Sequence, residues 1–187
     1  MNLVLRNIPN LLTALRLASA PMLAALLVRG DDRWALAIFV FAGLSDLADG
    51  WLAKRFHMKT RVGRYLDPAA DKVLMLASFL ALTAMHATPF WLTALVIARD
   101  VVIVLAILLA RFLELPLRVA PLYIGKFSTA VQVLYVAMML VLLAFGFEWP
   151  RVAATGAFVT GVFTAVSWIA YGNVWVRAAI AKAGHTA

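Results

Sequence analysis

Long apolar runs alternate with short polar or charged segments along almost the whole chain. About 20 apolar residues in an α-helix cross the hydrocarbon core of a bilayer, and these runs reach or approach that length. We therefore expect six helices, at about residues 10–28, 34–53, 68–85, 89–109, 125–145 and 150–176. Before them we expect a separate interfacial segment, residues 1–9, interrupted by Pro9. The predicted fold class is all-α: a polytopic membrane protein with about six transmembrane helices in one bundle, forming a single domain over residues 1–187.

The composition also favours a membrane protein. The chain is 65% hydrophobic and 14% charged, with a mean hydropathy of +0.93, which is more apolar than a soluble domain of this size needs. There is no cysteine, which excludes structural disulfides and thiol chemistry. Residues 18–20 (A-S-A) resemble a signal-peptide cleavage site, but Arg16 interrupts the apolar run before them and Pro21 follows them. We therefore expect this segment to be retained, and the lack of a transit peptide favours a bacterial source.

Charge predicts the orientation of the helices. The net charge of +8 comes mainly from basic residues in loops on one side of the predicted bundle, including the loop from Lys54 to Arg64. On the other side, three arginines are largely offset by nearby acidic residues. By the positive-inside rule we expect a multi-pass protein of the bacterial inner (cytoplasmic) membrane, with both termini and the basic loops on the cytoplasmic side. Anionic lipid head groups explain such loops better than nucleic acid does.

Four aspartates stand in two pairs at the ends of two apolar runs. Asp46 and Asp49 are three residues apart, and Asp67 and Asp71 are four apart, so each pair lies on one face of a helix. Carboxylates at the ends of membrane helices are costly and usually mark a site. Oxygen ligands, without cysteine and with few histidines, suit Mg²⁺, Mn²⁺ or Ca²⁺ rather than zinc. The simpler alternative is a set of solvated charges at helix ends, with Asp67 capping a helix that Pro68 starts.

Small residues share a stripe with the first aspartate pair. Gly50 and Ala53 follow Asp46 by four and seven residues, which would let a flat or extended ligand approach the helix backbone closely. The full order D-x2-D-G-x2-A, then G-x3-D-x3-D, resembles the signature of the CDP-alcohol phosphotransferase family. The matching positions are Asp46, Asp49, Gly50, Ala53, Gly63, Asp67 and Asp71. The family usually has Arg after the Ala, whereas this chain has Lys54 followed by Arg55, and lysine lacks the bidentate fork of arginine.

This resemblance implies an enzyme that attacks a CDP-linked lipid with an acceptor hydroxyl and releases CMP. It implies two divalent ions, Mg²⁺ or Mn²⁺, held by Asp46, Asp49, Asp67 and Asp71. It also implies that Asp71 is the general base for the acceptor hydroxyl. The residues implied to bind the cytidine diphosphate are Asn10, Thr13, Asp46, Asp49, Gly50, Ala53, Lys54, Arg55 and Gly63. Members of the family are dimers, so a homodimer is expected.

Further polar residues interrupt the other apolar runs. Arg16 continues a polar stripe that begins at Asn10 and Thr13, with snorkelling and interhelical hydrogen bonds as the alternative. The neighbours Arg99 and Asp100 stand mid-way through the fourth run, either as a lipid-phosphate site or as a structural ion pair. Polar positions also step along the start of the fifth run, at Gly125, Lys126, Thr129 and Gln132. The candidates to bind the phosphate of an acceptor or lipid are Arg16, Arg64, Arg99, Arg118 and Lys126.

The resemblance leaves the acceptor alcohol open between two subfamilies. The stretches A-G-L-S-D-L-A-D-G, A-R-D-V and G-K-F-S-T-A-V-Q are closer to CMP-forming cardiolipin synthases, which use phosphatidylglycerol and CDP-diacylglycerol. The alternative is a phosphatidylglycerophosphate synthase, which uses glycerol 3-phosphate. A cation transporter also places aspartates in a membrane, but it needs neither the small residues beside them nor the basic loop. A membrane prenyltransferase binds Mg²⁺ and pyrophosphate, but its motifs fit this chain poorly.

Overall fold

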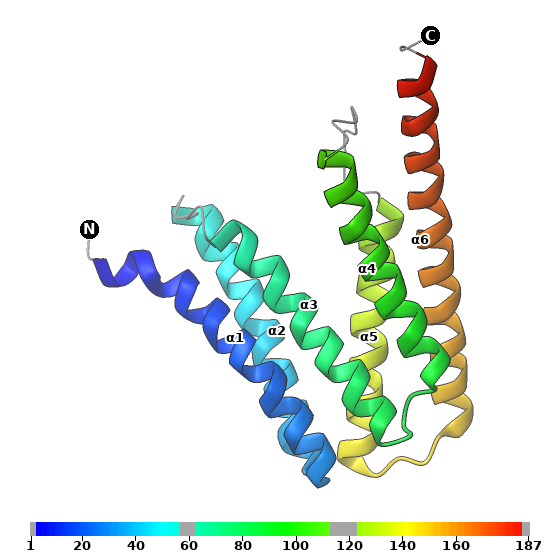
Figure 1. The fold of residues 1–187 in the computed structure, drawn as a ribbon. Helices are drawn as coiled ribbons and strands as arrows, with labels where there is room; N and C mark the ends of the chain where they lie inside the picture. Colours follow the sequence, from blue (N-terminus) through cyan, green and yellow to red (C-terminus); the bar gives the residue numbers. More distant parts are fainter. Residues whose placement is uncertain (1–2, 57–62, 113–122, 185–187) are drawn as a thin grey trace. The chain divides into compact units, whose positions relative to one another are not determined.

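The structure is a computed structural model that describes the backbone of residues 3–56, 63–112 and 123–184. Side chains are described for residues 13–47, 69–106, 108, 109, 112 and 123–176. Throughout the described backbone the regular structure is helical, which confirms the all-α prediction (Figure 1). The helices are α1 (Leu3–Arg29), α2 (Asp32–Phe56), α3 (Gly63–Ala84), α4 (Phe90–Phe112), α5 (Tyr123–Phe145) and α6 (Pro150–Gly184).

Pro9 and Pro68, at which the sequence predicts breaks or starts of helices, lie inside helices instead, as does Pro21. α1 begins at Leu3 and continues through Pro9, so the separate segment predicted for residues 1–9 is wrong. α3 begins at Gly63, five residues before Pro68, so the prediction that Asp67 caps this helix is also wrong. A proline in a helix removes one backbone hydrogen bond, and helices of 27 and 22 residues retain many others. The helical backbone keeps Asp67 and Asp71 one turn apart, as the spacing predicts.

Three helices end in the same hydrogen-bonded motif. Gly30 follows α1 with φ at +81°; its N–H donates to Leu27, and that of Asp31 donates to Leu26. Equivalent pairs of bonds close α3 at His86 and α5 at Gly146, which also have positive φ. This arrangement is the Schellman motif, in which a residue in the left-handed region satisfies the last carbonyl groups of a helix. It turns α1 into α2 within two residues, so the two helices form an antiparallel hairpin.

The chain divides into two compact units. The first comprises Met1–Ala87 and Val136–Trp149, and the second comprises Thr88–Tyr135 and Pro150–Ala187. In the first unit α1 packs against both α2 and α3 (Figure 1). One buried stripe runs along α1 with alternating steps of three and four residues: Thr13, Arg16, Ala20, Leu23 and Leu27. Such steps keep residues on one face of a helix, so the polar residues at one end of the stripe are buried like the leucines.

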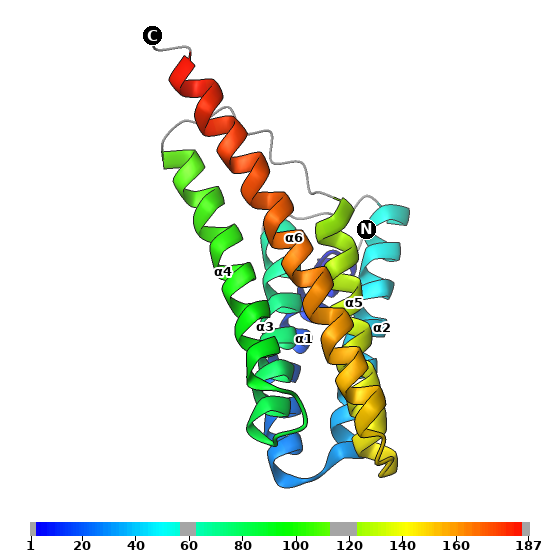
Figure 2. The same ribbon diagram turned by 90° about the vertical axis from the view of Figure 1, so that its right-hand side faces the viewer.

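In the second unit α4 packs against α6 (Figure 2). Gly161 of α6 permits a close approach, because a Cβ atom placed there would lie 2.6 Å from the ring of Trp91. A stripe of polar side chains, Thr160, Thr164 and Ser167, is buried along α6 at steps of four and three residues. Thr160 and Thr164 each donate a hydrogen bond to the carbonyl group four residues earlier in α6, which lets hydroxyl groups lie inside an apolar bundle.

Two helices in the described part of the chain are long and apolar enough to cross a membrane. They are Tyr123–Phe145, which is all of α5, and Pro150–Val176, which is most of α6. α6 itself continues to Gly184. By length and composition these helices support a membrane protein.

Candidate functional site

A buried arginine joins one aspartate from each predicted pair. Nη1 of Arg16 on α1 lies 3.1 Å from Oδ1 of Asp46 on α2 and donates a hydrogen bond of 3.0 Å to Oδ1 of Asp71 on α3. The side chain of Arg16 is 1% exposed, whereas those of Asp46 and Asp71 are 48% and 47% exposed. A buried charge is costly unless it is paired, so the two half-exposed carboxylates stabilise the buried Arg16.

The packing of α1 explains why these three side chains meet. Arg16 continues the stripe in which Ala20 and Leu23 are completely buried, and α1 contacts both α2 and α3. Asp46 follows the buried Ala42 by one turn, and Asp71 directly follows the buried Ala70. Small residues on both partner helices allow close packing beside the arginine. All three charged residues are candidates from the sequence. That Asp46 and Asp71 meet at one nitrogen of Arg16 follows from the packing of three helices.

The other aspartates lie on the same two helices. Asp49 is three residues after Asp46 on α2, and Asp67 is four residues before Asp71 on α3, so each pair is one helical turn apart. The side chains of Asp49 and Asp67 lie outside the described ones, as do those of the other predicted residues of this region: Asn10, Gly50, Ala53, Lys54, Arg55, Gly63 and Arg64. Arg118 lies outside the described residues altogether.

The donor set and its geometry fit a hard divalent cation. Among the described side chains no group of three or more metal-binding residues stands together, and only two of the four predicted ligands belong to that set. Those two, Asp46 and Asp71, place oxygens about equally far from one cationic nitrogen, so they converge on a point that accepts positive charge. Carboxylate oxygens are the ligands that Mg²⁺ and Mn²⁺ prefer.

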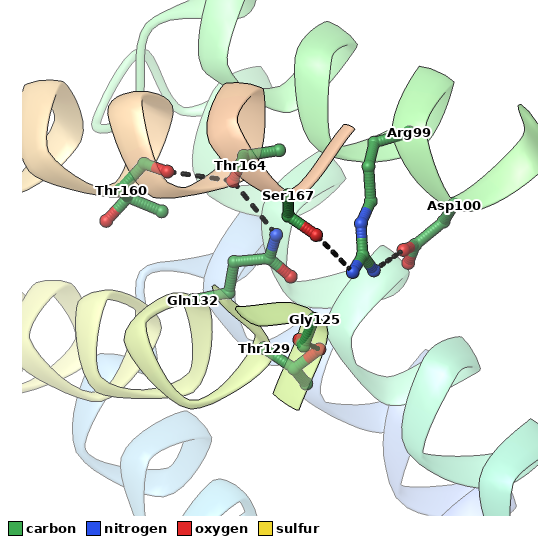
Figure 3. A network of polar contacts seen from close by, with 8 residues as sticks. All are labelled: Arg99, Asp100, Gly125, Thr129, Gln132, Thr160, Thr164 and Ser167. Carbon is green, nitrogen blue, oxygen red and sulfur yellow. Dashed lines mark hydrogen bonds and ion pairs between the residues drawn. The ribbon is translucent and has the colours of Figure 1, made fainter. Parts of the chain in front are cut away.

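A second polar centre lies in the second unit (Figure 3). Arg99 on α4 is buried, and its Nη1 donates to Oδ1 of Asp100 at 2.7 Å, which confirms the predicted pairing of these neighbours. Its Nη2 donates to Oγ of Ser167 on α6 at 2.9 Å. The ring of Tyr171, one turn further along α6, lies 5.6 Å from the guanidinium carbon, within the range of a cation–π contact. Ser167 and Tyr171 were not predicted from the sequence, in which the only feature that links them is a four-residue spacing inside an apolar run.

The polar positions at the start of α5 divide between two faces. Gly125 and Gln132 are buried, and Nε2 of Gln132 donates to Oγ1 of Thr164 on α6 at 3.1 Å (Figure 3). Oγ1 of Thr129 bonds to the carbonyl group of Gly125 within α5. Lys126 instead lies on the exposed side, with its ammonium group 5.8 Å from the centre of the Tyr123 ring. Lys126 therefore does not share the buried face that carries Gln132.

Comparison with known proteins gives a consistent result. A sequence model of the CDP-alcohol phosphatidyltransferase family matches residues 6–176. The chain is 37% identical over 150 residues to the Rattus norvegicus protein named cardiolipin synthase (CMP-forming). The matched region covers 72% of this chain and 50% of that relative. It is 35% identical over 150 residues to the protein of the same name from Streptomyces coelicolor, covering 76% of this chain and 68% of the relative.

A third relative carries a different name. The chain is 37% identical over 143 residues to the CDP-diacylglycerol–glycerol-3-phosphate 3-phosphatidyltransferase of Salmonella choleraesuis, covering 72% of this chain and 76% of the relative. The chain spans about half the length of the animal relatives that it matches. The family match extends over almost the whole chain and includes both aspartate pairs. The protein therefore belongs to the CDP-alcohol phosphatidyltransferase family.

Proposed function

We propose that this protein transfers a phosphatidyl group from CDP-diacylglycerol to the hydroxyl group of an acceptor alcohol and releases CMP, as a step of phospholipid biosynthesis. The observation that carries the proposal is the convergence of Asp46 and Asp71, from two helices, on one buried cation. The two carboxylates are half exposed, so a substrate can reach them. Membership of the family supplies the reaction class.

The chemistry needs a base and positive charge at the same place. The acceptor oxygen attacks the phosphorus atom that carries the diacylglycerol, and the bond from that phosphorus to the oxygen of CMP breaks. Asp71 takes the proton of the acceptor hydroxyl as general base. Asp46, Asp49, Asp67 and Asp71 would hold divalent ions, which would supply charge to neutralise the pyrophosphate and the leaving CMP. Arg16 holds the carboxylates of Asp46 and Asp71 close to each other, because one of its nitrogens, Nη1, contacts both.

The cytidine diphosphate is proposed to lie beside the D-x2-D-G-x2-A part of the aspartate motif. Gly50, Ala53 and Gly63 leave room beside the aspartates for the cytidine diphosphate. Lys54 or Arg55 contacts its phosphates. Asn10 and Thr13 are proposed to contribute from α1, where Thr13 lies on the same buried stripe as Arg16.

The acceptor carries a phosphate group in either version of the proposal. Phosphatidylglycerol, which would give cardiolipin, is favoured by the relatives named cardiolipin synthase. Glycerol 3-phosphate is the second candidate, favoured by the Salmonella choleraesuis relative. Arg99 is proposed to meet the phosphate of the acceptor, because it is buried and keeps a hydrogen on Nε that makes no hydrogen bond within the part of the chain described. The other proposed phosphate contacts are Arg16, Arg64, Arg118 and Lys126.

The same proposal includes the membrane arrangement. Six spanning helices in one domain, in the bacterial inner membrane with the aspartate site on the cytoplasmic side, fit the distribution of loop charges. The apolar character of α5 and α6 supports the bilayer as the protein's surroundings. A homodimer is proposed from the family alone, and a monomeric mass in mild detergent would overturn it.

The test of the proposed function is an acceptor comparison. Purified protein is supplied with CDP-diacylglycerol and Mn²⁺ or Mg²⁺, and CMP release is followed with phosphatidylglycerol or with glycerol 3-phosphate. CMP with phosphatidylglycerol alone, together with formation of cardiolipin, supports the first acceptor, and CMP with glycerol 3-phosphate alone supports the second. No CMP with either acceptor overturns both acceptors named in the proposal and directs the test to inositol phosphate, serine and other acceptor alcohols.

A further inference from the structure

The guanidinium of Arg99 is held from another helix. Its bond to Asp100 joins neighbours on α4, so that bond alone cannot orient Arg99 relative to α5 and α6. The contacts that do so come from α6, namely the hydrogen bond to Ser167 at 2.9 Å and the ring of Tyr171 at 5.6 Å. These two residues are one turn apart on α6 and therefore face the same way.

The position of Tyr171 depends in turn on a glycine in α5. A Cβ atom built on Gly125 would lie 2.6 Å from Oη of Tyr171 and 2.9 Å from its Cε2. Real Cβ atoms essentially never come so close to a neighbour, so any side chain at position 125 would push the ring of Tyr171 away. Three helices therefore meet at this point. α4 carries the guanidinium group of Arg99, α6 carries the ring of Tyr171, and the backbone of α5 at Gly125 lies against the end of that ring.

One N–H donor of Arg99, at Nε, has no acceptor among the described residues. The side chain of Arg99 is 5% exposed, and its Nε makes no hydrogen bond within the described part of the chain. A buried donor of this kind costs free energy unless a partner arrives. The direction in which the spare hydrogen points depends on the contacts that fix Nη1 and Nη2.

From this geometry we infer that Ser167 and Tyr171 are positioning residues that aim Arg99 at the phosphate of the acceptor, and that Gly125 makes room for the ring of Tyr171. The inference rests on the proposed function, in which Arg99 meets that phosphate. The inference adds Ser167 and Tyr171 of α6 as residues that set the affinity of the protein for the acceptor. Ser167 and Tyr171 act through Arg99 and need not touch the acceptor themselves.

The test measures KM and kcat for CMP release, with whichever of phosphatidylglycerol and glycerol 3-phosphate the wild-type protein uses. Tyr171→Leu removes a partly desolvated cation–π contact, and Ser167→Ala removes a hydrogen bond to the guanidinium. In each variant we expect the KM for the acceptor to rise about threefold to thirtyfold. The KM for CDP-diacylglycerol and kcat should change by less than about threefold. Tyr171→Phe keeps the ring and should keep the wild-type KM.

Two controls separate positioning from general stability. Phe163→Leu removes another ring of α6, which packs edge-on against Phe127 at 5.0 Å, and should leave the KM for the acceptor unchanged. In an Arg99→Gln background, Tyr171→Leu should have no further effect on this KM, because the group that it positions is gone. Gly125→Ala should reproduce the effect of Tyr171→Leu, while thermal unfolding of each variant verifies that it is folded.

The outcomes distinguish this inference from the function on which it rests. An active wild-type protein whose Tyr171→Leu and Ser167→Ala variants keep their KM for the acceptor overturns the inference and leaves the proposed function standing. An equal loss in Tyr171→Leu whether or not Arg99 is present also overturns it. A wild-type protein that releases no CMP with either acceptor overturns both phosphate-bearing acceptors of the proposed function, and the inference falls with them.

Discussion

Replacing Arg16 with methionine removes the charge that Asp46 and Asp71 share and keeps an unbranched side chain at the same buried position. The stripe around it carries Ala20 and Leu23, so methionine suits the packing of α1 against its partner helices. We expect the Arg16→Met variant to fold and to lose most of its activity.

The magnitude follows from the distances. Both carboxylate oxygens lie about 3 Å from one nitrogen, so they are separated by at most twice that distance. Two carboxylate charges at roughly 6 Å, no longer bridged by Arg16, repel by about 1–3 kcal/mol at an effective dielectric constant between 20 and 80. Rotating a side chain out of its preferred geometry costs about 0.5–1.5 kcal/mol, so the repulsion suffices to move Asp46 and Asp71 apart. A loss of that order in transition-state stabilisation lowers kcat about tenfold to a hundredfold.

The assay is CMP release at saturating CDP-diacylglycerol and Mn²⁺, with thermal unfolding in detergent as the measure of folding. Arg29→Met is the matched control, because Arg29 ends the same helix and is exposed. Arg16→Lys keeps a cation without the fork and should retain more activity than Arg16→Met. Wild-type kcat in a folded Arg16→Met variant would refute the role of Arg16, and equal losses in the methionine and lysine variants would refute the role of its charge.

Three other predictions address the base, the metal and the helix packing. Asp71→Asn should lower kcat by about 10²–10⁴-fold while binding of CDP-diacylglycerol survives, as measured by turnover and by ligand-induced shifts in the unfolding temperature; full turnover would remove Asp71 as the base. Chelation of divalent ions should abolish CMP release, and added Mg²⁺ or Mn²⁺ should restore it; activity that persists in chelator would contradict a metal-dependent site. Gly161→Ala should destabilise the protein by about 1–2 kcal/mol, because its new methyl group overlaps the half-exposed ring of Trp91. Gly172→Ala, where nothing lies within 4 Å, should be neutral or slightly stabilising in the same unfolding measurement, and equal effects of the two changes would contradict the overlap.

The helices were predictable because apolar length is a strong signal, but their ends at prolines were not. Pro9 and Pro68 both disfavour a helix locally, yet α1 and α3 continue through them. The local preference of one residue is outweighed by the many backbone hydrogen bonds of a long helix. The ends that carry Gly30 and Gly146 follow the usual rule, since glycine adopts positive φ without strain.

The two aspartate pairs were predictable from spacing, whereas their partners depended on how the helices pack. No local pattern states that Arg16 meets one aspartate from each of two other helices. Ser167 and Tyr171 were missed for a related reason. Hydroxyl groups in apolar helices commonly bond to their own backbone, as Thr164 does, so their spacing carries no information about an arginine on another helix.

The central claim is that Asp46 and Asp71 belong to one divalent-cation site of a phosphatidyl transfer reaction. Its most direct test is a Mn²⁺ titration, followed by electron paramagnetic resonance, of the wild-type protein and of the Asp46→Asn/Asp71→Asn double variant, with Glu148→Gln as the control for loss of an exposed carboxylate. The account predicts two bound Mn²⁺ ions per chain in the wild-type and Glu148→Gln proteins, and loss of high-affinity binding in the folded double variant. Unchanged Mn²⁺ binding in the double variant would contradict the account.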